Sequence, residues 1–244
     1  MRWIFLSPHL DDAVFSAGGM IRDITRGGIQ VEIWTVMCGD PQLREYSPFA
    51  MELHEKWGFA SAEETVQRRR EEDKSAAIHV GATTQHFDFL DCIYRRGENG
   101  DWLYSAITLP PHEADAQYPI RIAAEVSARL APDDMLVCQL ALGSHVDHVL
   151  VRRAAELLGR PLRYIVDVPY WFYSPEEFET KSAGLKESAY KITEPNLDMW
   201  IEAALSYRSQ FPVLGDRFDT PEKAKESIRQ YWSEREGIRL LQIE

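Results

Sequence analysis

The first 37 residues contain the succession strand, helix, strand, which is the unit from which parallel sheets are built. Residues 3–6 form a short apolar run that ends at Ser7-Pro8. Residues 12–26 carry apolar side chains at helical spacing and stop at Gly27-Gly28. Residues 29–37 are rich in Val, Ile, Trp and Thr, which favour strands. A helix of this length can carry the chain from one parallel strand to the next, so the chain begins as an α/β protein does.

The same alternation continues to about residue 168. Further helices are predicted over residues 63–80, 119–130 and the later part of 145–158, and further strands over 86–90, 135–140 and 162–166. Residues 39–62 and 91–118 show no clear period and are expected to be long loops; loops of this length in a compact domain are usually functional. We therefore expect an α/β fold with a mostly parallel sheet.

The pattern changes after Pro169, where two helices are predicted over residues 196–207 and 221–236. No repeat, linker or low-complexity tract separates this part from the rest. We expect one domain over residues 1–244, with a core of about residues 1–168 and a C-terminal appendage of about residues 169–244. The roles of the two long loops and of the appendage, as lid, interface or core, stay open.

Charge and cysteine content limit the kinds of partner. The chain has 27 Lys and Arg against 39 Asp and Glu, a formal net charge of −12, which argues against nucleic acid and against an anionic membrane surface. Its three cysteines form no CxxC pair, so a zinc knuckle or a disulfide framework is not indicated. No signal peptide or membrane span is apparent, and we expect a cytoplasmic protein, with a homo-oligomer left open.

Two short polar segments follow predicted strands and carry the chemistry. Pro8-His9-Leu10-Asp11-Asp12 follows the first strand, and His145-Val146-Asp147-His148 follows the strand over residues 135–140. The carboxyl ends of parallel strands lie at one edge of a sheet, so the two segments can meet there. His9, Asp12 and His148 would form a His₂Asp set with one open position, as in catalytic zinc sites.

The remaining residues of these segments suit the other roles in a metal-dependent hydrolysis. Asp11 could act as general base, and His145 could stabilise an oxyanion or protonate a departing nitrogen. Asp147 could fix the tautomer of a neighbouring His. The alternative for Asp11 or Asp12 alone is a helix cap, because Asp is common at helix N-termini.

Other charged residues are candidates for binding a substrate. The helix over residues 63–80 carries Arg68-Arg69-Arg70, mostly as a solvated face, and one of these could point into the cleft. Asp91 lies at the end of the strand predicted over 86–90 and could bind hydroxyl groups. Arg69, Arg95 and Arg96 could supply positive charge there for an anionic substrate.

The segments PHLDD and HVDH, in this order, resemble those of the LmbE/PIG-L family of metal-dependent de-N-acetylases. Softer matches extend the resemblance to about residue 210, including Arg69-x-x-Glu72 and Tyr207-x-Ser209-Gln210. The resemblance implies a Rossmann-like three-layer fold, His9, Asp12 and His148 as zinc ligands, and Asp11 as general base. It also implies that His145 assists the tetrahedral intermediate with Asp147 beside it, and that Arg69 and Asp91 contact sugar hydroxyls. Residues 91–96 depart from the family's usual Pro-Asp-Gly, which leaves the substrate open.

Together these features predict a zinc-dependent hydrolase that removes an N-acetyl or other N-acyl group from an N-acetylglucosamine-type sugar or its conjugate. Fe²⁺ could take the place of Zn²⁺, since affinity order and availability both decide the metal. Two alternatives stay open. One is another metallohydrolase, such as a phosphoesterase, and the other is a non-catalytic sugar-binding protein with the same fold.

Overall fold

The computed structural model describes residues 1–43 and 45–243. Within them, seven strands form one sheet in the order β3-β2-β1-β4-β5-β7-β6. The first five strands in this order run parallel, and β7 and β6 are antiparallel additions. The predicted mostly parallel sheet is therefore confirmed. The strand bounds are β1 Trp3–Ser7, β2 Val31–Thr35, β3 Thr83–His86, β4 Met135–Gln139, β5 Leu162–Ile165, β6 Leu185–Lys191 and β7 Gly237–Ile243.

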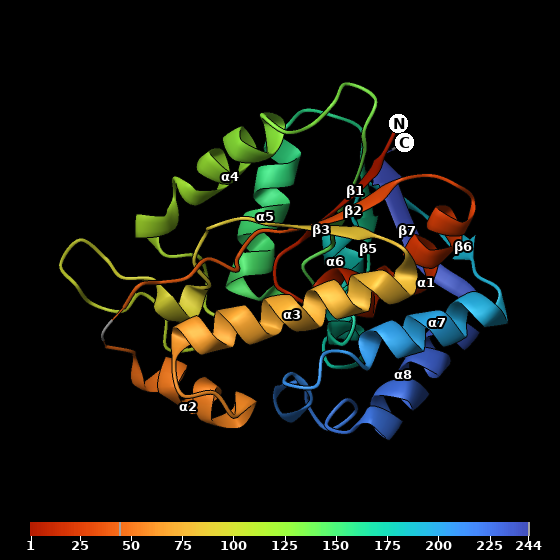
Figure 1. Ribbon diagram of the computed structural model, residues 1–244. Helices are drawn as coiled ribbons and strands as arrows, with labels where there is room; N and C mark the ends of the chain where they lie inside the picture. The colour runs from red at the N-terminus through yellow and green to blue at the C-terminus, as the bar shows by residue number, and fades with distance from the viewer. Residues whose placement is uncertain (44, 244) are drawn as a thin grey trace.

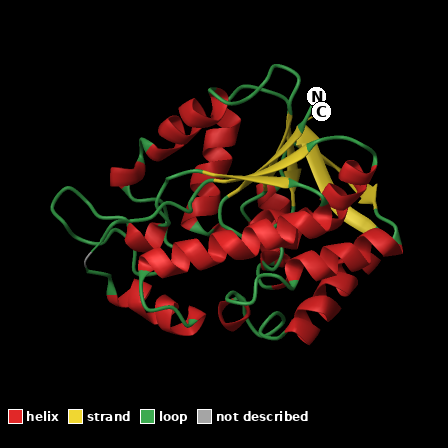
Figure 2. Cartoon of the chain, in the orientation of Figure 1, coloured by secondary structure: helices red, strands yellow, loops and turns green. Residues whose placement is uncertain are grey.

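Helices cover both faces of the sheet and produce three layers (Figures 1 and 2). One layer contains α4 and α5, which pack against each other, and the other contains α1, α3, α7 and α8. The helix bounds are α1 Asp12–Arg26, α2 Pro48–Trp57, α3 Ala62–Val80, α4 Tyr118–Ser127, α5 Val146–Leu157, α6 Phe178–Lys181, α7 Glu194–Ala204 and α8 Pro221–Ser233. No helix in the described part of the chain is both long and apolar enough to cross a membrane.

Helix α1 is kinked where it packs against α7. Ala17 leaves helical geometry at φ −145°, which frees the carbonyl of Val14 from the regular ladder. The indole Nε1 of Trp200 on α7 donates to that carbonyl at 2.7 Å. A Cβ on Gly18 would lie 2.4 Å from the Trp200 ring, so glycine permits this close approach. The contact ties the C-terminal part of the chain to the helix that follows the first strand.

Two of the expected local assignments are wrong. Residues 39–62 are not one long loop, because they contain α2. Its boundary signals are present in the sequence: Ser47 accepts from the Ala50 N–H at the start, Pro48 is the first helical residue, and Gly58 ends the helix at φ +76°. The apolar side chains of α2 show no clear helical period, so the sequence pattern did not predict this helix.

The strand predicted over residues 86–90 lies earlier, at β3. This strand is at the edge of the sheet and exposes alternate side chains, so its sequence Thr-Thr-Gln-His is polar. Phe87 and Phe89, which suggested a strand, are buried just beyond its carboxyl end. Phe87 packs against the ring of Trp34, and Phe89 packs against the ring of Tyr118.

The C-terminal segment supplies two strands that the sequence pattern did not predict. β7 pairs with β5 through Tyr164 and Leu241, and β6 pairs with β7 along its whole length. The expected helices over residues 196–207 and 221–236 are present as α7 and α8 with slightly different bounds. Residues 169–244 were expected to be an appendage, and their described part completes the sheet of the core.

Candidate active site

The turn after β1 presents three of the expected site residues. The Ser7 hydroxyl donates to the His9 carbonyl at 2.7 Å and accepts from the Ala13 N–H at 3.0 Å, which fixes the turn at both ends. Asp11 is the N-cap residue of α1, but its side chain accepts no cap hydrogen bond. The carboxylate is therefore available to the cleft, and the capping alternative is not what this side chain does.

The segment after β4 is held in an unusual conformation. Ala141, Gly143 and Ser144 all have positive φ. A Cβ on Gly143 would lie 2.1 Å from the ring of Tyr170, so only glycine fits. The segment leads into α5, and the Nδ1 of His145 accepts from the Asp147 N–H at 3.1 Å. Because Nδ1 is an acceptor, the proton of a neutral His145 ring is on Nε2.

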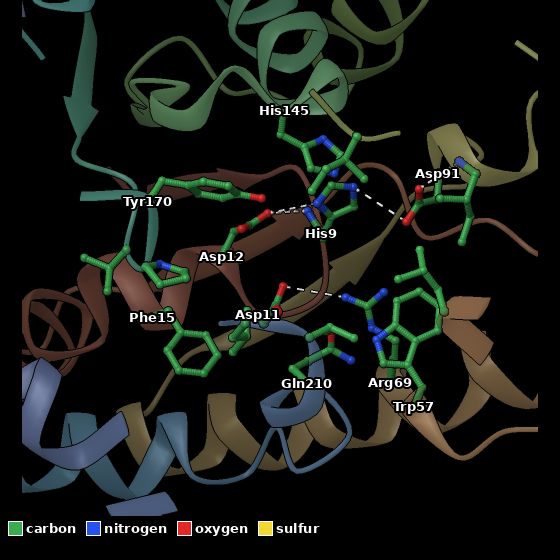
Figure 3. Close-up of a pocket in the computed structure, with 17 residues that line it drawn as sticks. His9, Asp11, Asp12, Phe15, Trp57, Arg69, Asp91, His145, Tyr170 and Gln210 are labelled. Atoms are coloured by element: carbon green, nitrogen blue, oxygen red, sulfur yellow. Dashed lines mark hydrogen bonds and ion pairs between the residues drawn. The ribbon is translucent and has the colours of Figure 1, made fainter. Parts of the chain in front are cut away.

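His9, Asp12 and His148 meet at one point, although they come from the carboxyl ends of two different strands. The Oδ2 of Asp12 lies 3.3 Å from Nδ1 of His9 and 3.2 Å from Nε2 of His148 (Figure 3 shows His9 and Asp12). All three residues are buried. This is the set expected to bind a metal.

In neutral rings, the hydrogen bonds on the far side of each ring leave these facing nitrogens with the lone pairs that a metal ion requires. Nε2 of His9 lies 3.0 Å from Oδ2 of Asp147, and Nδ1 of His148 lies 2.9 Å from Oδ1 of Asp167. A carboxylate accepts, so each ring donates there and turns its other nitrogen to Asp12. Nε2 of His148 makes no hydrogen bond within the described residues. Three electron-rich atoms that converge in a buried place suit a divalent cation.

The electrostatics of the pocket also favour a cation. Burial disfavours charge on His9, but Asp91, Asp12 and Asp147 outweigh it and raise its pKa well above the usual value. Burial acts likewise on His148, yet the carboxylates of Asp12 and Asp167 raise its pKa to about 9. The pocket thus attracts positive charge, which a bound divalent ion would supply in place of protons.

His145 behaves differently. Burial, reinforced by the neighbouring His9 and His148, lowers the pKa of His145 well below the usual value. The neutral ring keeps its Nε2–H as a donor toward the cleft that it lines.

Asp11 and Arg69 lie together on the opposite wall of the cleft. Nη2 of Arg69 lies 3.7 Å from Oδ1 of Asp11, and its guanidinium lies 5.0 Å from the centre of the Trp57 ring (Figure 3). Burial and the neighbouring Asp12 raise the pKa of Asp11 to about 7, and Arg69 opposes them. A carboxyl group that exchanges its proton near neutral pH suits acid–base chemistry.

Asp147 contacts two histidines through different groups. Its backbone N–H donates to Nδ1 of His145. Its carboxylate accepts from Nε2 of His9 at 3.0 Å and from the Cys92 N–H at 2.9 Å. Burial alone would raise the pKa of Asp147, but Arg95, at 2.6 Å, and His9 hold it well below its ordinary value. Asp147 therefore orients the expected ligand His9.

Of the three candidate residues in the loop after β3, Asp91 lines the cleft, whereas Arg95 and Arg96 do not. Oδ2 of Asp91 lies 3.7 Å from Nε2 of His9, and Asp91 lines the cavity. Arg95 is buried against Asp147 and Asp115, and Arg96 is exposed over the Trp102 ring. The expectation that Arg95 and Arg96 could supply charge to the cleft is wrong, because neither lines it. Arg69 does.

Three further residues complete the site and were not among the predicted site residues. Asp167 follows β5 and binds His148; Tyr170 contacts the His148 ring edge-on at 5.3 Å between centroids. Gln210 lines the cavity and donates to the Ser209 hydroxyl at 2.7 Å, and Ser209 is bound to Glu72 on α3. The signal for Asp167 was its place at another strand end; Gln210 belongs to the softer match Tyr207-x-Ser209-Gln210, which assigned it no role.

The cavity has a volume of about 120 Å³. Its lining combines polar and apolar side chains. The apolar side chains come from α2, from the loops after β3 and β5, and from the segment after α7: Leu53, Trp57, Ile93, Ile107, Val168, Pro169, Val213 and Leu214. Such a site binds small molecules with a few oriented polar groups beside apolar surface.

Comparison with known proteins gives consistent matches. A family model described as PIG-L, GlcNAc-PI de-N-acetylase, matches residues 4–158, which include PHLDD and HVDH. A 2′-N-acetylparomamine deacetylase from Niallia circulans is 25% identical over 238 residues, covering 89% of this chain and 84% of that protein.

Two solved structures share the fold over 99% of this chain and 97% of theirs. A zinc-inhibited form of a teicoplanin deacetylase has a TM-score of 0.84 at 26% identity. A deacetylase–bog complex from the teicoplanin biosynthesis pathway has a TM-score of 0.85 at 28% identity.

Proposed function

The chain belongs to the PIG-L family of GlcNAc-PI de-N-acetylases, and on this premise we propose that it is a zinc-dependent hydrolase that removes an N-acetyl or other N-acyl group from an N-acetylglucosamine-type sugar or its conjugate. One observation carries the proposal: Nδ1 of His9 and Nε2 of His148 converge on Oδ2 of Asp12, with Asp11 in the same cleft. A site that only bound sugars would have no need of this acid–base group beside three facing ligands.

We assign the metal to His9, Asp12 and His148, whose facing lone pairs fit a divalent cation. A cation bound there would polarise the amide carbonyl and make a water molecule more acidic. Zn²⁺ is the proposed ion, since His₂Asp with an open position is typical of catalytic zinc. Fe²⁺ uses the same ligand types, so metal analysis of the purified protein would distinguish the two.

The remaining side chains supply the proton transfers. Asp11 takes a proton from the water whose oxygen attacks the carbonyl carbon. His145 donates its Nε2–H to the carbonyl oxygen as that oxygen becomes negative. When the C–N bond breaks, the proton held by Asp11 passes to the nitrogen and the proton that remains on the attacking oxygen passes to solvent, so that a carboxylate and a free amine leave.

Arg69 and Asp91 are proposed to hold substrate hydroxyls, since both line the cavity, Asp91 beside His9 and Arg69 beside Asp11 (Figure 3). The relatives described above are named for the deacetylation of 2′-N-acetylparomamine and for the teicoplanin pathway. Those names support the inclusion of sugar conjugates, as do the apolar side chains that line the cavity, which suit a larger group attached to the sugar.

Acetate release tests the proposal. Zinc-loaded protein would be incubated with N-acetylglucosamine, with its alkyl and aryl glycosides, and with N-acetylated aminoglycosides. We expect acetate and an equal amount of free amine from at least one glycoside, and none after the metal is removed with a chelator. A folded, zinc-loaded protein that releases acetate from no member of the panel would overturn the proposed function.

A further inference from the structure

Arg95 is a buried cation in a place where the sequence suggested a substrate contact. It is 3% exposed. Its Nη1 lies 2.6 Å from Oδ1 of Asp147 and donates to the Leu90 carbonyl at 2.9 Å, while its Nε lies 2.9 Å from Oδ2 of Asp115. The guanidinium also lies between two aromatic rings, with centroids at 5.1 Å for Tyr104 and 4.8 Å for Tyr118. These contacts leave the guanidinium little freedom to move.

Arg95 and His9 share one carboxylate. Asp147 is fully buried; one of its oxygens faces Arg95, and the other accepts from Nε2 of His9 at 3.0 Å and from the Cys92 N–H at 2.9 Å. The chain of contacts thus runs from Arg95 through Asp147 to a nitrogen of His9. The opposite nitrogen of that ring, Nδ1, faces Asp12.

We propose that Arg95 is a positioning residue for the metal site: its guanidinium fixes the Asp147 carboxylate, which fixes the ring of His9 with Nδ1 turned to Asp12. The inference rests on the proposed metal site, but not on the identity of the substrate. A buried carboxylate rotates or shifts when it loses its counter-charge, and a metal ligand follows the group that orients it.

The competing explanation is that Arg95 merely holds the loop over residues 91–118 to the core. Its contact with Asp115 and the two tyrosine rings fits that role equally well. The two explanations differ in one measurable respect. Only a positioning role links Arg95 to the affinity of the folded apoprotein for a metal.

Zinc affinity of the metal-free protein, measured by competition with a chromophoric chelator, tests the proposal. We expect Arg95→Met to weaken zinc binding by about 10-fold to 100-fold, as loss of an outer-shell partner does. Arg2→Met is the matched control. Arg2 also binds two carboxylates, Asp134 and Glu32, but it precedes β1 at the opposite edge of the sheet, so zinc affinity should not change.

Two further variants keep the test decisive if Arg95→Met does not fold. Arg95→Lys keeps the charge but not the planar fork, and we expect an intermediate loss of zinc affinity. Arg95→Lys/Asp147→Asn should bind zinc no more weakly than Asp147→Asn, because both changes break the same chain of contacts. A zinc affinity of Arg95→Lys equal to that of the parent, or effects that multiply in the double variant, would overturn the proposal. Neither readout depends on hydrolysis, so absence of acetate release would bear on the proposed function alone.

Discussion

Arg69 lies beside Asp11 on one wall of the cleft, with 3.7 Å between Nη2 and Oδ1, which is longer than a hydrogen bond. The two groups attract each other, but they do not form a close bidentate ion pair. Asp11 is therefore held in place and keeps an oxygen free to accept a proton. Asp11 and its neighbour Asp12 therefore have different surroundings: Asp11 lies beside Arg69, whereas Oδ2 of Asp12 faces the two histidines.

These surroundings predict different effects for two adjacent substitutions. We expect Asp11→Asn to retain zinc and to lower kcat by about 100-fold or more, because the amide cannot accept the proton of the attacking water. Asp12→Ala should instead lose zinc. Metal content and kcat would be measured on the same preparations, and full activity of Asp11→Asn would refute its assignment as base.

Arg69 is expected to act on substrate and on Asp11 together. Loss of a hydrogen bond from a charged group costs about 1.5–3 kcal/mol, so Arg69→Met should lower kcat/KM by about 10-fold to 100-fold without loss of zinc. Arg70→Met is the control on the same helix, since Arg70 binds the Cys38 carbonyl and Asp88 outside the cavity. Equal kcat/KM values for the two variants would contradict the role of Arg69.

Asp167 is expected to orient His148 for the metal. Asp167→Asn should weaken zinc affinity by about 10-fold to 100-fold, because the amide no longer reliably accepts from Nδ1 of the ring. The comparison variant is Asp134→Asn, which loses an ion pair with Arg2 far from the site and should keep the parent affinity. An unchanged affinity in Asp167→Asn would show that His148 is oriented by other contacts.

Gly143→Ala tests the strained segment before His145. The new methyl group would meet the Tyr170 ring, which contacts His148, so we expect unfolding to become easier by about 1–3 kcal/mol and kcat to fall. Gly28→Ala is the control, because Gly28 also has positive φ but open space around its Cα. Chemical denaturation and kcat would be compared. Similar kcat losses in both variants would mean that backbone strain, rather than Tyr170, is responsible.

The three thiols are expected to be unreactive in the native protein. All are buried, and burial raises the pKa of Cys38 to about 12 and shifts those of Cys92 and Cys138 upward as well. The thiolate is the reactive form, so Ellman's reagent should label no thiol rapidly in the native protein and all three after unfolding. Rapid labelling of one thiol before unfolding would disprove this expectation.

Most of the parallel sheet could be predicted from sequence, because its central strands are short apolar runs at regular distances from helices. The strands expected at residues 3–6, 135–140 and 162–166 correspond to β1, β4 and β5. The edges could not be predicted in this way. β3 and β6 are polar because one or both of their faces are exposed. β7 becomes a strand of this sheet by pairing with β5, which is distant in the sequence.

The candidate site, like the sheet, could be predicted only in part. The placement of PHLDD and HVDH after two parallel strands was enough to expect His9, Asp12 and His148 together. It was not enough to place Asp167, which binds His148 on α5, or Gln210, whose neighbour Ser209 is held by Glu72 on the distant helix α3.

The sequence by itself determined which side-chain chemistry stands at the carboxyl ends of the parallel strands, since strand ends follow from local apolar patterns. Only the tertiary structure decided which atoms of these side chains donate, accept or face the proposed metal. It turned Arg95 inward to Asp147, placed that carboxylate against His9, and made Nδ1 of His145 an acceptor of the Asp147 N–H. The physical reason is that a ring nitrogen or a carboxylate oxygen takes its role from hydrogen-bond partners, and these partners come from segments that only folding brings together.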